Sequence, residues 1–144
     1  MIEQDTIKLL RECDAGVKMG ISSIDDVLDY VYATNFKERL IECRDKHLRL
    51  QSEIDELLKK YHDDGKEPNP MAKSMSYIKT NVKLIVNESD GTIADLITDG
   101  CNMGIKSLNK YLNKYVAADE KSKDIAKKLI KQEQDLLEGM RDFL

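Results

Sequence analysis

The chain has 144 residues and a mass of 16.5 kDa, enough for one domain to bury a core without disulfides or structural metals. Its 41% hydrophobic and 35% charged residues, with two prolines and no tryptophan, exclude a disulfide scaffold and a disordered chain and suit a helical bundle. The net charge of −4 leaves no basic surface for nucleic acid or anionic lipid, so neither is expected as a partner. We expect a single domain over residues 1–144.

The cysteines and the N-terminus indicate the compartment. Cys13, Cys43 and Cys101 are odd in number, widely spaced and free of any CxxC pair, which favours reduced thiols in a reducing compartment. The opening residues, MIEQDTIKLL, carry acids early and lack the apolar segment of a signal peptide. No apolar run approaches the roughly 20 residues that span a bilayer. The sequence therefore predicts a cytoplasmic protein without a membrane partner.

Apolar residues recur at spacings of three and four through the first half of the chain, which predicts two amphipathic helices. The first covers residues 7–31. Thr34 or Asn35 is the expected cap of the second, which covers residues 36–61. The stripe of the second helix consists of Phe36, Leu40, Cys43, His47, Leu50, Ile54, Leu57 and Tyr61. The stretch HDDGKEPNP at 62–70 holds both prolines and is predicted to be a loop.

The second half of the chain repeats the pattern. Residues 71–87 are compatible with a shorter helix, and Ser89 or Asp90 is placed to cap the next long one. The stripe of that helix consists of Ile93, Ile97, Cys101, Ile105, Leu108, Leu112 and Tyr115. Ile125, Leu129, Glu133, Leu136, Met140 and Phe143 line the final helix. No segment alternates with period two, so no sheet is expected and the chain is predicted to be all-α.

A short sequence motif, called the repeated phrase below, occurs twice: as CDAGVKMG at 13–20 and as CNMGIKS at 101–107. A shift of 88 residues superposes these two stretches, and a shift of 89 superposes parts of the second and fourth helices. Both halves thus align at almost one offset, which favours two helical hairpins of common design. Two hairpins joined by a long connection form a four-helix bundle with an internal pseudo-two-fold axis, here with a short helix in the crossover.

This organisation resembles the ferritin-like superfamily, and within it a group of uncharacterised bacterial four-helix proteins. The stretches that carry the resemblance are CDAGVKMG, MAKSMSYIKTNVKL, DGTIADLITDGCNMGIKSLNKYL and the closing EGMRDFL. The resemblance implies a di-metal site with one inward Glu on the first and third helices and a Glu-x-x-His pair on the second and fourth. Carboxylate oxygens would bridge the two ions, and imidazoles would hold the outer positions.

The chain departs from that ligand pattern on every helix. The resemblance places the inward Glu at the positions of Val17 and Ile105, which are aliphatic and cannot bind a metal. The paired motif aligns with Arg44-x-x-His47 and Glu133-x-x-Leu136, so each helix lacks one of its two ligands. One histidine and one glutamate cannot assemble a di-iron centre. We therefore expect a degenerate bundle with no metal, no cofactor and no catalytic residue.

His47 and Glu133 remain as binding candidates because both lie on apolar stripes, at mid-bundle if the pseudo-two-fold axis holds. A buried charge is costly unless it is paired, so the two side chains are expected to approach each other or share ordered water. A mononuclear metal or small-ligand site is the alternative. Close neighbours are expected at the glycines inside the helices, since each costs about 1 kcal/mol relative to Ala. These are Gly16, Gly20 and Gly104.

The cysteines on the stripes are expected to be free, buried thiols that act as small hydrophobes. Cys13 and Cys101 should lie on opposite sides of the pseudo-axis, about 11 Å apart along it at the rise of an α-helix. Cys43 and Cys101 can lie on the same side, but two thiols are half of a zinc site. Lys18, next in the repeated phrase, is expected to reach solvent.

The most economical functional hypothesis is a non-enzymatic protein with a structural, stress-related or partner-binding role. It is expected to self-associate through helix faces, as a dimer, with an unidentified protein partner also possible. The main alternative is a metal-binding or oxidase relative that draws its ligands from His47, Glu133, Glu42, Asp45 and Asp135. A third class, a carrier of a hydrophobic ligand, requires an apolar cavity among Val17, Met19, Ile105 and Leu108.

Overall fold

The structure, a computed structural model, describes residues 3–66 and 89–144. They form four α-helices, a short 3-10 helix and no strand: α1 (Gln4–Leu28), α2 (Thr34–Lys60), α4 (Asp90–Lys114), α5 (Glu120–Gly139) and η2 (Arg141–Phe143). The all-α prediction is confirmed over this part of the chain. The shorter helix expected at 71–87 lies outside the described residues. None of the helices described here is long and apolar enough to cross a membrane.

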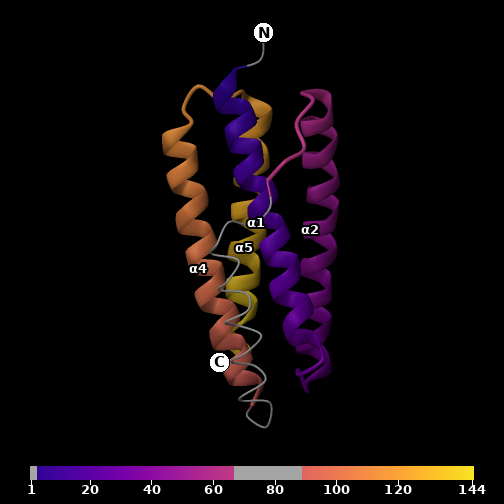
Figure 1. Ribbon diagram of the computed structural model, residues 1–144. Coiled ribbons are helices and arrows are strands. Elements are labelled where there is room, and N and C mark those ends of the chain that lie inside the picture. Colours follow the sequence, from indigo (N-terminus) through magenta and orange to yellow (C-terminus); the bar gives the residue numbers. More distant parts are fainter. Residues whose placement is uncertain (1–2, 67–88) are drawn as a thin grey trace.

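The helices lie side by side in a bundle (Figure 1). α1 and α5 run in one direction, whereas α2 and α4 run in the other. The most extensive contacts join α1 to α2 and α4 to α5, so each hairpin packs mainly within itself. α1 also contacts α5, but α2 and α4 make no comparable contact with each other. The cross-section is therefore compressed along one diagonal, and α2 lies at an outer corner.

The corner position of α2 explains its narrow apolar stripe. Its buried side chains recur almost strictly at spacings of four and three, and the residues between them are mostly exposed. Such a stripe is the seam of a helix that meets its neighbours along one line. α1 buries a broader face, and between residues 12 and 21 none of its residues is exposed.

The apolar core is divided into two clusters along the bundle axis. Val17, Leu50 and Leu129 belong to the first cluster, toward the N-terminal end of α1. Ile24, Cys43 and Leu136 belong to the second, which includes the stacked rings of Phe36 and Phe143, 4.5 Å apart. Each helix thus passes from one cluster to the other within about two turns.

The turn between α1 and α2 is held by a carboxylate from the second hairpin. The backbone N–H groups of Tyr32 and Ala33 donate to Asp90 Oδ1 and Oδ2 at 2.8 and 2.9 Å. The expected cap at Thr34 or Asn35 is wrong, because α2 begins at Thr34 and its N-cap residue Ala33 has no side-chain cap. Asp90 instead binds the donors of that turn.

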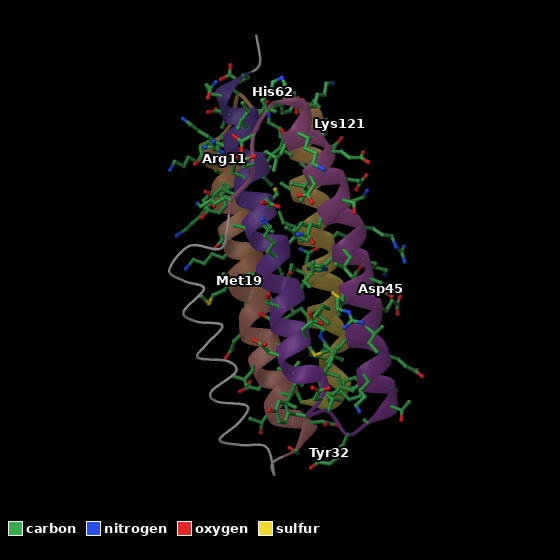
Figure 2. The ribbon with its side chains drawn as sticks, turned by 45° about the vertical axis from the view of Figure 1, so that its right-hand side comes forward. Arg11, Met19, Tyr32, Asp45, His62 and Lys121 are labelled. Carbon is green, nitrogen blue, oxygen red and sulfur yellow. The ribbon has the colours of Figure 1, made fainter. Side chains whose placement is uncertain are left out.

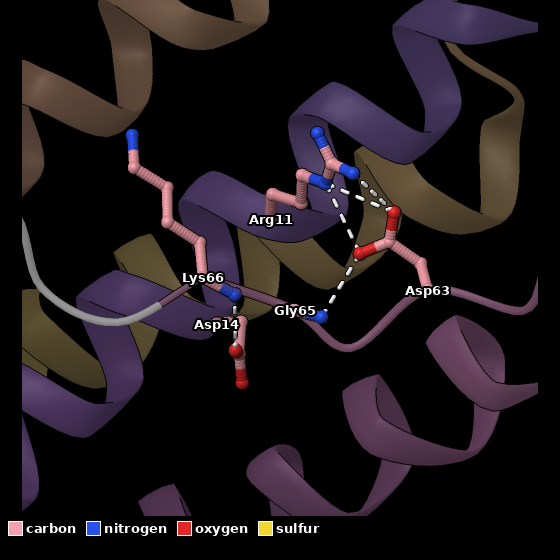
Figure 3. Close-up of polar contacts among 5 residues, drawn as sticks. All are labelled: Arg11, Asp14, Asp63, Gly65 and Lys66. Atoms are coloured by element: carbon pink, nitrogen blue, oxygen red, sulfur yellow. Dashed lines mark hydrogen bonds and ion pairs between the residues drawn. The ribbon is translucent and has the colours of Figure 1, made fainter.

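The segment that follows α2 folds back onto α1 (Figure 3). Arg11 Nε donates to both oxygens of Asp63 at 3.0 Å, and Asp63 Oδ1 also accepts from the backbone N–H of Gly65 at 2.9 Å. Gly65 has a φ of 81°, a conformation that favours glycine, and a Cβ there would collide with Asp14. The contacts fix the first residues of the long connection against the first hairpin.

Candidate functional site

A layer of small and polar residues separates the two apolar clusters, and each helix contributes one residue to it. Gly20 of α1 lies between Val17 and Ile24, and His47 of α2 lies between Cys43 and Leu50. Gly104 of α4 and Glu133 of α5 occupy the corresponding places on the other hairpin. The structure therefore brings His47 and Glu133 together at mid-bundle, with a glycine from each hairpin beside them.

Both ring nitrogens of His47 face hydrogen-bond acceptors. Nε2 lies 2.9 Å from Glu133 Oε1, and Nδ1 lies 3.0 Å from the backbone oxygen of Cys43. Because a carbonyl oxygen can only accept, Nδ1 carries a proton. His47 is fully buried and Glu133 is 8% exposed, so little water competes for this contact. The arrangement fits an imidazolium that donates one hydrogen bond from each nitrogen.

The electrostatics of the layer favour that charged form. Burial acts to lower the pKa of His47, but its hydrogen bonds to Cys43 and Glu133 and the nearby negative charge outweigh burial and raise the pKa from 6.5 to about 10. At neutral pH the pair is therefore an internal salt bridge. In this state Nε2 donates a proton to Glu133 and has no lone pair to offer a metal ion.

Gly20 is the glycine that this pair requires. A Cβ at Gly20 would lie 2.8 Å from His47 Cδ2 and 2.9 Å from Nε2, closer than real side chains approach. At Gly16 the nearest atom is Leu129 Cδ2 at 3.5 Å, and at Gly104 it is in the Glu133 carboxyl at 3.8 Å. The expected close packing is thus found at Gly20, whereas the other two have ordinary contacts.

The three cysteines are free and buried, as expected. Cys13 lies in the first cluster and has its pKa raised to about 12, mainly by burial. Cys101 lies in the second cluster, where burial raises its pKa and the charge of Glu133, with a hydrogen bond to it, raises it further. Cys43 Sγ lies 3.5 Å from His47 Nδ1. The spacing of four residues on one helix face was the signal for that pairing, and the sequence reasoning missed it.

The two positions implied for metal ligands belong to the first apolar cluster: Val17 lies about one turn from Gly20, and Ile105 directly follows Gly104. Val17 is fully buried there, and Ile105 is partly buried and packs against the same cluster. Leu108 also belongs to that cluster, and Met19 is half-buried on α1. These side chains therefore provide apolar contacts and no metal ligand.

The further carboxylates of the alternative ligand set do not join the polar layer. Asp45 lies on the outer face of α2 (Figure 2) and is exposed. Glu42 is exposed and pairs with Lys46 at 3.4 Å, and Asp135 pairs with Lys131 at 2.7 Å. Within residues 3–66 and 89–144, no group of three or more His, Cys, Asp or Glu side chains is arranged to hold a metal ion.

Asp14, the second residue of the repeated phrase, is an anchor that the sequence reasoning missed. It is 1% exposed, and its Oδ2 accepts from Lys18 Nζ at 2.9 Å and from the backbone N–H of Lys66 at 3.0 Å (Figure 3). Its counterpart Asn102 is exposed. Lys18 keeps 24% of its side chain exposed, and its Nζ is also bound by this buried carboxylate. The two copies of the repeated phrase therefore differ at this position: Asp14 is a buried anchor, whereas Asn102 faces solvent.

Comparisons of the chain with protein-family models, with curated proteins and with solved structures found no match in any of the three. The functional assignment therefore rests on the geometry and chemistry of the polar layer.

Gly20→Ala should destabilise the protein although alanine is the better helix former. Overpacking against the fixed imidazole should lower the free energy of unfolding by about 1–3 kcal/mol. Gly100→Ala is the matched control, because no atom lies within 4 Å of a Cβ there. That change should raise the free energy by about 1 kcal/mol. Urea unfolding followed by circular dichroism measures both, and equal effects of the two substitutions would contradict the packing described for Gly20.

The raised pKa of His47 predicts a loss of stability in alkali. The contribution of the charged pair is complete below pH 6.5, the unfolded pKa, and disappears as the pH rises through about 10. We expect the free energy of unfolding to fall by on the order of 5 kcal/mol across that range. The double variant His47→Leu/Glu133→Met should lack this component, whereas His62→Asn, at an exposed histidine, should keep it. An identical alkaline slope in the double variant and the wild type would contradict the assignment.

Proposed function

We propose that this chain is a non-enzymatic, ferritin-like bundle without a complete di-metal site, which acts as a structural or partner-binding protein. The observation that carries the proposal is the direct contact of 2.9 Å between His47 Nε2 and Glu133 Oε1. In this contact Nε2 donates its proton to the carboxylate, so it has no lone pair with which to bind a metal ion. The proposed role of the pair is to close the centre of the bundle.

The donor set of the layer supports the same conclusion. A ferritin-like di-metal centre takes carboxylates from all four helices and two histidines. Here α1 and α4 contribute Gly20 and Gly104, neither of which has a ligating side chain. Val17 and Ile105 add apolar atoms nearby. The polar layer therefore has too few ligands to hold the metal ions that oxidase chemistry requires.

The direction of the helices supports the ferritin-like part of the proposal. α2 and α4 run the same way (Figure 1), so α2 ends and α4 begins at opposite ends of the bundle. Two antiparallel hairpins joined by one long crossover are the arrangement of ferritin-like folds. Short connections alone would give alternating directions instead.

Metal analysis tests the proposal. After incubation of the reduced protein with Fe²⁺, Mn²⁺ or Zn²⁺ and removal of free ions, we expect far less than one ion per chain by elemental analysis. One or more ions per chain in the wild type, lost in His47→Ala and kept in His62→Ala, would overturn it. The second variant separates binding at mid-bundle from adventitious binding at the exposed turn that contains His62.

Self-association through α2 is the second part of the proposal. Ile41 and Leu48 are 39% and 43% exposed, and their spacing of seven residues places them on the same side of the helix. Two apolar side chains on an otherwise charged surface support a modest helix-to-helix contact between two copies. The proposed assembly is a homodimer, with another protein that presents an amphipathic helix as the alternative occupant.

Light scattering at increasing concentration tests the dimer. We expect the wild type to move toward twice the mass of the chain, and Ile41→Lys/Leu48→Lys to stay monomeric because the contact would lose its apolar centre. Val116→Lys is the matched control, since Val116 is 66% exposed but lies just beyond α4 at the bundle end. A wild type that remains strictly monomeric at high concentration removes this part of the proposal.

A further inference from the structure

The charges of α4 are separated by sign along the helix. All of its acidic residues precede all of its basic residues, in the order Asp90, Asp95, Asp99, Lys106, Lys110 and Lys114. Asp90 and Lys114 lie in the first and last turns, where the helix dipole favours their charges. The dipole acts only within those turns, so it does not account for the four charges between them.

These four charges are placed against the stability of the helix itself. Asp95 precedes Asp99 by four residues, and Lys106 precedes Lys110 by the same spacing. Like charges at this spacing are neighbours on the helix surface and repel each other. All four side chains are exposed, and within the part of the chain that the structure describes none of them forms an ion pair. Their charges are therefore free to meet a partner outside the chain.

The four charges form one row on the outer face of α4. At 3.6 residues per turn, their positions fall within about 60° of one another around the helix axis. The buried residues of α4, among them Ile97 and Leu108, lie on the opposite side. Met103 is 49% exposed and lies at the middle of the row, next to the exposed Asn102. The outer face thus has an acidic half, an uncharged centre and a basic half.

This row is complementary to itself when its direction is reversed. Asp99 and Lys106 are equally distant from the point between residues 102 and 103, and so are Asp95 and Lys110. If a second copy of α4 lies antiparallel on the first, with a two-fold axis through that point, each aspartate faces a lysine of the other copy. A two-fold axis repeats every contact, so each of the two kinds of ion pair occurs twice.

We propose that a second copy of this chain docks antiparallel on the outer face of α4, through a two-fold contact centred between Asn102 and Met103. The two Met103 side chains provide the apolar centre of this contact, and the ion pairs surround it. A parallel arrangement in the same register sets like charges opposite each other, so the charges also select the direction. Exposed ion pairs contribute little individually and are screened by salt, so the contact is weak and strongest at low ionic strength.

This contact goes beyond the self-association proposed through α2 and does not depend on it. α2 and α4 lie on opposite sides of the bundle in Figure 1 and make no extensive contact with each other, so the two surfaces do not overlap. The contact through α2 is apolar and persists at about 0.5 M salt, whereas the ionic contact through α4 is screened there. Ionic strength therefore separates the two contacts.

Disulfide trapping tests the geometry of the α4 contact. In Met103→Cys the two introduced thiols lie next to the two-fold axis, whereas in Asn113→Cys they are about 30 Å apart along the helices. Asn113 is exposed on the same face, and the native cysteines are at most 8% exposed. Under mild oxidation at about 20 mM salt, Met103→Cys should form linked dimers at least about tenfold faster than Asn113→Cys. Equal rates in the two variants would overturn the inference.

Charge exchange tests what holds the two copies together. Asp95→Lys/Asp99→Lys makes the row wholly basic, and Lys106→Glu/Lys110→Glu makes it wholly acidic. Combined with Met103→Cys, each should form linked dimers about tenfold more slowly than Met103→Cys alone, because like charges then face each other. An equimolar mixture should recover the rate as mixed dimers, which mass spectrometry identifies. A mixture no faster than its components would contradict the proposed pairing.

The α2 variant separates this inference from the proposed function. Ile41→Lys/Leu48→Lys, combined with Met103→Cys, should still form linked dimers at about 20 mM salt, at a rate within about twofold of Met103→Cys alone. Loss of trapping in this variant would show that the linked dimers depend on α2 and would overturn a separate contact through α4. Retention of trapping would support the α4 contact whether or not the α2 dimer exists.

Discussion

The hydrogen bond between His47 Nε2 and Glu133 Oε1 lies where the two apolar halves of the core meet, and the four helices are arranged around it. α1 can pass this level only because Gly20 has no side chain to meet the imidazole. α4 passes it at Gly104, against the carboxyl group of Glu133. The contact links α2 to α5 and therefore joins the two hairpins to each other.

Burying such a pair is energetically costly, since the free energy lost by desolvating two charges can exceed the free energy of their mutual attraction. Three features reduce the cost here: both ring nitrogens donate, the pair is neutral as a whole, and Glu133 keeps a small exposed fraction. Removing one partner would leave a buried group without its counterpart. Replacing both with apolar residues can be almost neutral. We infer that the pair determines the register between the hairpins more than the total stability.

The sequence predicted the helices and the meeting of His47 with Glu133 because both follow from periodicity. Stripes at spacings of three and four place those residues on inward faces, and the offset of nearly 88 residues places them at similar depth. Asp14 could not be predicted in the same way, since its partner is the backbone N–H of Lys66, 52 residues away on a loop. Asp90 likewise binds the turn at Tyr32 and Ala33, which only the packing of the two hairpins brings near.

The protonation state of His47 is the most direct test of a centre closed by a salt bridge. Nitrogen-15 NMR of the histidine rings, recorded from pH 6 to 10 on the metal-free protein and again with added Zn²⁺, reads both ring nitrogens separately. The account predicts that Nδ1 and Nε2 of His47 are both protonated at neutral pH and lose a proton only toward pH 10, with no response to Zn²⁺. An unprotonated Nε2 at neutral pH, or a shift of that nitrogen when Zn²⁺ is added, would contradict it.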